Sequence, residues 1–177
     1  MKKKIFISSI LLIFSFNLTF ACSCASNKSF LKTISKSKVV ALIKVNQFLS
    51  YDQIYDQNTA MSMEVEVIEL YKGNISENKI KVWGDNGALC RPYLDTIFEE
   101  GRYYIVGLFS GGDGKNGYFH KDETTDDFAI SSCGQFWLYI DIDKNMAYGI
   151  INSNIRKIGL EKLKKKLFRK LKSNKRQ

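Results

Sequence analysis

The sequence has a single histidine, His120, and lacks the motifs that mark most hydrolases. It contains neither the two-histidine helix of zinc peptidases nor a serine nucleophile elbow. The best nucleophile and base pair that the chain offers is Cys133 with His120, and neither residue sits in a known motif. The Gly111–Lys115 loop lacks the serine or threonine that follows the lysine of a phosphate-binding loop. We therefore expect the protein not to be an enzyme.

Cysteine is also scarce, with four residues: Cys22, Cys24, Cys90 and Cys133. Their spacing includes no C-x-x-C pair, which disfavours a four-thiolate zinc site. An even number of cysteines in an oxidising compartment favours two disulfides over free thiols. The spacing alone leaves all three pairings open.

The one long apolar run lies at the N-terminus. Lys2-Lys3-Lys4 precedes an apolar stretch over Ile5–Phe20, and the small residue Ala21 follows it. This order of charge, apolar run and small residue is typical of a secretory signal peptide. We expect residues 1–21 to be removed between Ala21 and Cys22, which predicts a secreted, periplasmic or cell-surface protein.

Positive charge is concentrated at the other end of the chain. The formal net charge is +9, yet residues 22–155 hold 13 basic and 17 acidic side chains, whereas residues 156–177 hold 11 basic and 1 acidic. We expect one domain over 22–155 and a separate basic tail over 156–177. The domain offers no basic surface interleaved with aromatic residues, so specific nucleic-acid binding is disfavoured.

Short apolar or alternating segments separated by turn residues predict a mostly β protein. A small closed barrel resembling the oligonucleotide/oligosaccharide-binding (OB) fold is favoured over a sandwich, because closure removes exposed sheet edges. A short N-terminal helix is expected within Phe30–Ser37. The expected strands are Val39–Val45, Met63–Tyr71, Ile80–Trp83, Tyr103–Phe109, Phe128–Ser131, Phe136–Ile140 and Ala147–Ile151.

Leucines at steps of three and four residues predict an amphipathic helix in the C-terminal tail: Leu160, Leu163, Leu167 and Leu171. Two interpretations stay open for this helix. The leucines pack on the barrel and leave the lysines in water, or the helix adsorbs to an anionic membrane or another polyanion surface.

Several short segments, in order over residues 22–140, resemble the tissue inhibitors of metalloproteinases, whose inhibitory half is a netrin-like module with an OB-type barrel. They are Cys22-Ser23-Cys24, Val39-Val40-Ala41, Glu69-Leu70-Tyr71-Lys72-Gly73, Gly87-Ala88-Leu89-Cys90, Tyr104-Ile105-Val106-Gly107, Gly112-Asp113-Gly114-Lys115 and Ile130-Ser131-Ser132-Cys133.

The resemblance implies a mechanism for the new N-terminus. The amine and carbonyl of Cys22 would chelate the catalytic zinc of a target protease at the coordination position that such sites keep open. Ser23 would enter the specificity pocket, and Tyr55 matches a contact residue of the family. The protein would act as a monomer with no cofactor of its own, on the zinc of its partner.

The resemblance also implies how the inhibitory wedge is built. It comprises Cys22, Ser23 and Cys24, with Ala88 and Leu89 brought beside Ser23 as a second arm. The implied disulfides are Cys22–Cys90 and Cys24–Cys133.

The sequence departs from the family in four ways. It lacks a third disulfide, a proline after the cysteine pair and the second, cysteine-rich domain, and it carries an acidic insertion around Asp122–Asp127. The alternative function is therefore a non-inhibitory, disulfide-stapled netrin-like binding module, either free or anchored as a lipoprotein at Cys22. Thr19-Phe20-Ala21 is a poor lipidation signal, which disfavours the anchor.

Overall fold

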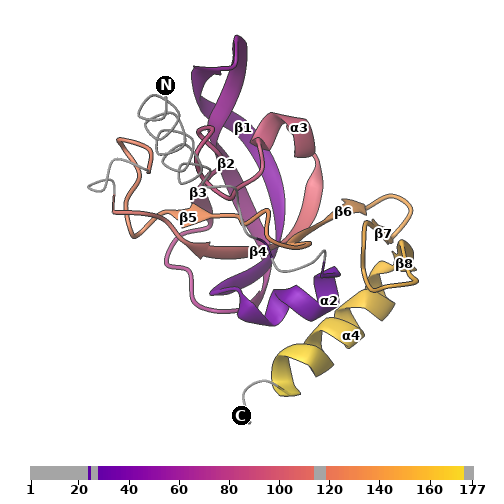
Figure 1. The fold of residues 1–177 in the computed structure, drawn as a ribbon. Coiled ribbons are helices and arrows are strands. Elements are labelled where there is room, and N and C mark those ends of the chain that lie inside the picture. The colour runs from indigo at the N-terminus through magenta and orange to yellow at the C-terminus, as the bar shows by residue number, and fades with distance from the viewer. Residues whose placement is uncertain (1–23, 25–27, 114–118, 174–177) are drawn as a thin grey trace, which may run out of the picture.

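A computed structural model describes residues 24, 28–113 and 119–173. Its strands are β1 (Val39–Ile54), β2 (Gln57–Lys72), β3 (Lys79–Trp83), β4 (Tyr103–Ser110), β5 (Phe128–Ala129), β6 (Trp137–Asp141), β7 (Met146–Tyr148) and β8 (Lys157–Gly159). Its helices are α2 (Phe30–Thr33), the 3₁₀ turn η2 (Ile34–Lys36), α3 (Leu94–Ile97) and α4 (Leu160–Ser173). Figure 1 shows the strands wrapped into a barrel with α2 and α4 below it.

Strand β1 closes the barrel because it pairs along one edge with β2 and along the other with β4. The order around the barrel is β1-β2-β3-β5-β4 and back to β1, and β3 runs parallel to β5. This is the strand order of an OB-fold barrel, so the predicted fold class is confirmed. Strands β6, β7 and β8 extend the sheet outward from β4.

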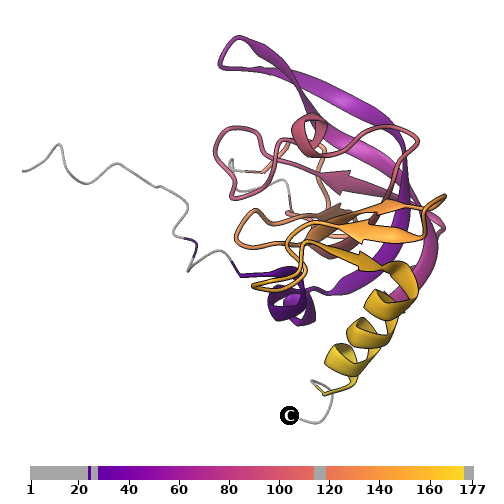
Figure 2. The ribbon, with the colours of Figure 1, turned by 90° about the vertical axis from the view of Figure 1, so that its right-hand side faces the viewer.

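The hairpin of β1 and β2 is longer than the sequence predicts, and its outer half extends beyond the barrel (Figure 2). Polar residues dominate Asn46–Ile54, so the alternation of apolar residues that predicts a strand is absent there. Five register shifts along the pair bend β1 enough to serve both the barrel and the hairpin. The hairpin turns at Tyr55 and Asp56, which both have positive φ (47° and 62°), the backbone of a tight hairpin turn.

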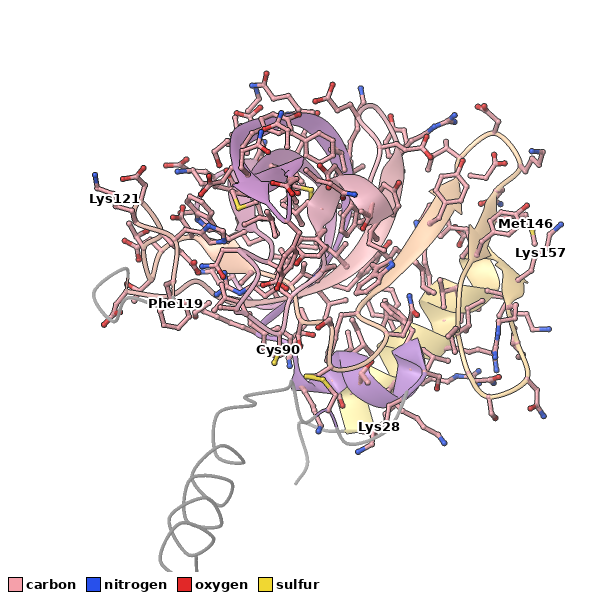
Figure 3. The ribbon with its side chains drawn as sticks, turned by 45° about the horizontal axis from the view of Figure 1, so that its top comes forward. Lys28, Cys90, Phe119, Lys121, Met146 and Lys157 are labelled. Atoms are coloured by element: carbon pink, nitrogen blue, oxygen red, sulfur yellow. A yellow bond between two sulfur atoms is a disulfide. The ribbon has the colours of Figure 1, made fainter. Side chains whose placement is uncertain are left out.

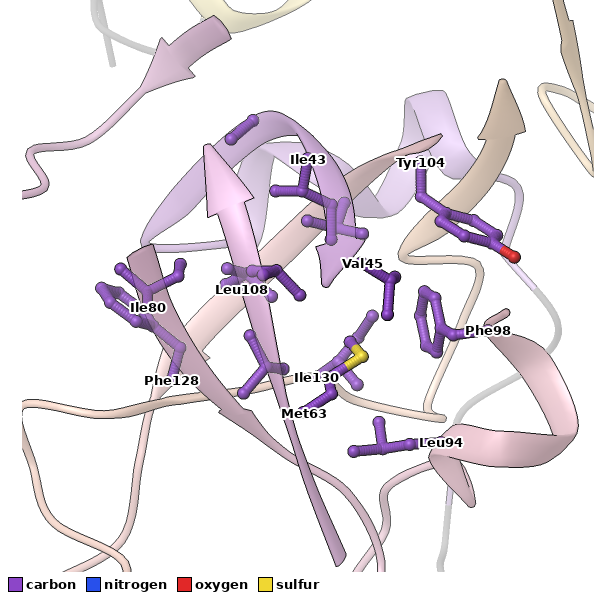
Figure 4. Close-up of a cluster of buried hydrophobic side chains, with 14 of the residues drawn as sticks. Ile43, Val45, Met63, Ile80, Leu94, Phe98, Tyr104, Leu108, Phe128 and Ile130 are labelled. Atoms are coloured by element: carbon purple, nitrogen blue, oxygen red, sulfur yellow. The ribbon is translucent and has the colours of Figure 1, made fainter. Parts of the chain in front are cut away.

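Two apolar clusters hold the fold together. The first fills the barrel, where Ile43, Val45, Met63 and Leu108 converge (Figure 4). The second lies between the outer face of the barrel and the helices, and it contains Phe30 and Ile34. Successive residues of β1 point alternately into the two clusters. Ala41 and Ile43 belong to the first cluster, and Val40 and Leu42 belong to the second.

Helix α4 completes the second cluster. All four predicted leucines are buried there, at 9% exposure or less: Leu160, Leu163, Leu167 and Leu171. The leucine face of α4 therefore packs on the barrel, as in the first of the two interpretations. It leaves the charged face of α4 in solvent.

Tyr71 packs beside α4, and its environment leads us to expect a loss of stability in alkaline solution. Burial, followed by the charge of Glu69 and the hydrogen bond that the Tyr71 hydroxyl donates to it, raises the pKa of Tyr71 above its usual value. The folded phenol keeps its proton where an unfolded tyrosine loses it, so this contribution is complete below about pH 10 and declines above it. We expect the free energy of unfolding to fall above pH 10 by about 1.4 kcal/mol per pH unit more in the wild type than in Tyr71→Phe. Urea titrations across this range test it, with the exposed Tyr51→Phe as control; identical slopes for wild type and Tyr71→Phe would contradict it.

Candidate functional site

A disulfide between Cys24 and Cys133 ties the N-terminal segment to the loop that follows β5. It is one of the two pairs that the family resemblance implies. Backbone contacts extend the attachment: the Gln135 N–H donates to the Lys28 carbonyl at 3.0 Å, and the Thr33 hydroxyl donates to the Gln135 carbonyl at 2.6 Å. The chain is therefore attached to the barrel at Cys24 and again over Lys28–Thr33.

The loop that carries Cys90 lies against the same segment. The Ser132 N–H donates to the Cys90 carbonyl at 2.9 Å, so the residues next to Cys133 are bonded to Cys90. Figure 3 shows Cys90 and Lys28 at the same end of the molecule. Cys90 is itself disulfide-bonded. Its predicted partner Cys22, with Ser23 and the cleavage point after Ala21, lies outside the described residues.

The stretch before Cys90 is fixed by short-range hydrogen bonds. The Asp85 carboxylate accepts from the Gly87 and Leu89 N–H groups at 3.1 and 2.7 Å, and the Asn86 side chain accepts from the Ala88 N–H at 3.1 Å. Such side-chain turns hold a loop in one shape without a strand partner. The result places Ala88 in solvent and Leu89 half-buried, next to the cysteine end of the barrel.

Tyr55 lies at the tip of the long hairpin and is 81% exposed. The hairpin end and the Asp85–Leu89 turn are neighbours, because a methyl group on Gly87 would contact the Ile54 side chain at 3.5 Å. Between the hairpin and α3 lies a pocket of about 300 Å³ that includes Tyr55 and Tyr93. The predicted contact residue Tyr55 is thus contiguous with the turn that carries Ala88 and Leu89.

The acidic insertion contains a buried ion pair that the sequence analysis missed. Arg91 donates two parallel hydrogen bonds to Glu123, at 2.9 and 2.8 Å, and the two side chains are only 9% and 0% exposed. The Arg91 guanidinium also lies over the Phe119 ring, 5.5 Å from its centre. Since Arg91 directly follows Cys90, the insertion anchors the base of the Cys90 loop.

His120 is buried, in contrast to the solvated histidine usual in a loop. Its ring stacks on Trp83 with centroids 4.6 Å apart, and its Nε2 lies 2.9 Å from the Gly84 carbonyl. The Trp83 indole N–H donates to Asp127 at 3.0 Å. These contacts seat the insertion on β3. Cys133, which the sequence analysis paired with His120 as a nucleophile and base, has its sulfur in the disulfide with Cys24.

No cluster of three or more histidine, cysteine, aspartate or glutamate side chains suited to a metal ion occurs within the described residues. Over the same part of the chain, none of the helices has the length and apolar character needed to span a membrane.

No protein-family model matches this chain, and no curated protein matches it.

Proposed function

We propose that the protein is an exported inhibitor of a zinc metalloprotease that acts through a free N-terminus at Cys22. The observation that carries this proposal is the meeting of three segments at one end of an OB-type barrel. The segment at Cys24 is disulfide-bonded to Cys133, and Ser132 beside it is hydrogen-bonded to Cys90. The first and the last of these segments, at Cys24 and before Cys90, are those that form the wedge in the family that the sequence resembles.

The proposed chemistry needs only the terminal residue. A cysteine in a disulfide offers no thiolate, which leaves its α-amine and its own carbonyl oxygen as a five-membered chelate. An α-amine in a model peptide has a pKa near 8, far below that of a lysine, so it can give up its proton to a metal near physiological pH. The zinc site of a metalloprotease keeps one position open for water or substrate, and the chelate would displace that water.

The described residues support this proposal by their rigidity. Segments that are already ordered around a contact lose little conformational freedom on binding, and the loss of such freedom is a main cost of association. The Asp85 and Asn86 turns, the Cys24–Cys133 disulfide and the Arg91–Glu123 pair all restrain the segments around the proposed contact. The exposed Ala88 and Tyr55 would extend the contact beyond the terminus.

An N-terminal extension tests the chelation directly. The mature protein, starting at Cys22, is assayed against a panel of zinc metalloproteases beside a variant with one alanine added before Cys22. The extension converts the amine into an amide, which cannot chelate, so we expect inhibition to weaken by at least about 100-fold, or ~2.7 kcal/mol. A protein with one alanine added after Gln177 is the matched control and should inhibit like the wild type.

Two results would contradict the proposal. Equal inhibition by the extended and mature proteins would place the contact elsewhere, and no inhibition by a correctly processed protein would leave a disulfide-stapled binding module. Mass spectrometry of the natively exported protein separates these cases from a third. An acylated Cys22 would show a lipoprotein anchor in place of the free amine.

A further inference from the structure

The solvent face of α4 is strongly basic and has few acidic partners. The helix carries seven basic residues and one acidic residue. Within the described residues, the ion pairs of α4 involve only Lys164, which contacts Glu69 at 2.7 Å and Glu161 at 3.7 Å. We define the basic face as the exposed or half-buried cations on the side opposite the leucines: Lys162, Lys165, Lys166, Arg169 and Lys172.

An apolar patch lies directly beside this basic face. Phe168 is 51% exposed and makes an edge-to-face contact with Tyr71, with ring centroids 5.8 Å apart. The two rings border a pocket of about 470 Å³ between α4 and the end of β2, which Leu171 and Lys172 also line. A large aromatic ring in solvent beside cations is not needed for packing, because the four leucines already attach the helix.

We propose that the basic face and Phe168 together bind the surface of an anionic phospholipid bilayer. The cations would contact lipid phosphates while the Phe168 ring enters the boundary between headgroups and acyl chains. A polymeric anion would use the cations equally well but would gain nothing from an apolar ring and pocket. The leucine face stays on the barrel, so binding needs no detachment of the helix.

The charge distribution favours one orientation on such a surface. Residues 22–155 carry more acidic than basic side chains, so an anionic surface attracts the α4 side and repels the rest. Figures 1 and 2 show α2 and α4 close together at the lower end of the barrel, and residues of both helices belong to the second apolar cluster. The proposed lipid binding does not depend on the proposed protease inhibition.

Vesicle co-sedimentation of the full mature chain tests the proposal. The probes are phosphatidylcholine vesicles with and without phosphatidylglycerol, and the variants are Lys165→Gln/Arg169→Gln and Phe168→Ser. Each cation near an anionic surface strengthens binding roughly five-fold, so we expect the double variant to bind the anionic vesicles about 25-fold more weakly. Phe168→Ser should weaken binding about ten-fold, because it removes the inserted ring without a change of charge.

The matched control is Lys79→Gln/Lys121→Gln, which removes the same charge at two exposed sites on β3 and in the insertion. It should bind like the wild type. Binding that is equal on neutral and anionic vesicles, or absent from both, would overturn the proposal. So would a Phe168→Ser protein that binds anionic vesicles normally while heparin competes with the lipid, since that result identifies a polymeric anion as the partner.

Discussion

Replacement of Glu123 by glutamine is expected to lower the free energy of unfolding by about 3 to 5 kcal/mol, although the change removes no volume. The substitution leaves the guanidinium of Arg91 buried, with a neutral amide in place of its carboxylate. The Glu123 carboxylate also accepts the Gly112 N–H, and one of the amide's two ends cannot accept a hydrogen bond. An uncompensated buried charge is among the few single changes with so large a cost.

A second variant separates the buried charge from the loss of packing. Arg91→Met/Glu123→Leu removes both charges and keeps apolar bulk, so its stability should exceed that of Glu123→Gln and fall below the wild type only by the roughly 1–3 kcal/mol that the Gly112 N–H costs when it loses its acceptor. Asp122→Asn, at the exposed neighbouring position, is the control and should change stability by less than about 0.5 kcal/mol. Chemical denaturation measures all three. A loss below 1 kcal/mol for Glu123→Gln would show that water reaches the pair.

The barrel could be predicted from the sequence because the residue pattern of its strands reflects which side chains face the core and which face solvent. The predicted strand over Met63–Tyr71 alternates apolar and acidic residues, as expected for a strand with one face on the core. The outer half of the hairpin was missed because polar residues dominate its sequence, although Ala60 is buried in the first cluster and Phe48 packs against it. Strand β8 and helix α3 were missed because three or four residues are too few for a periodic pattern.

The candidate site was accessible only in part. The cysteine positions and the Ala88-Leu89 turn could be selected from the resemblance, but spacing could not choose among three disulfide pairings, because chain separation does not determine spatial distance. The insertion was recognised only as acidic. That Glu123 would be buried against Arg91, 32 positions earlier, depends on how the loop folds back onto β3, and no local pattern encodes this.

Removal of the Cys24–Cys133 disulfide should have the largest effect on stability. The bond joins residues 109 positions apart, and the loop-closure relation for such a loop gives about 4 to 5 kcal/mol. Cys24→Ala/Cys133→Ala is the appropriate variant, because a single substitution would leave a thiol free to exchange with the disulfide of Cys90. We expect its urea midpoint to fall by the corresponding amount, with an unchanged slope if the unfolded chain is equally exposed.

The same variant shows whether the Cys24–Cys133 disulfide only stabilises the domain or also positions the N-terminal segment. Neither cysteine belongs to the two apolar clusters, so the barrel should still fold at low temperature. Under those conditions the N-terminal segment loses its covalent attachment to the Cys133 loop and keeps only contacts such as that of Lys28 with Gln135. If the N-terminal segment is the inhibitory element, inhibition should weaken at least about ten-fold in the folded variant, because ordering the detached segment then opposes binding. Undiminished inhibition by a folded variant would show that the Cys24–Cys133 disulfide stabilises the domain without positioning the terminus.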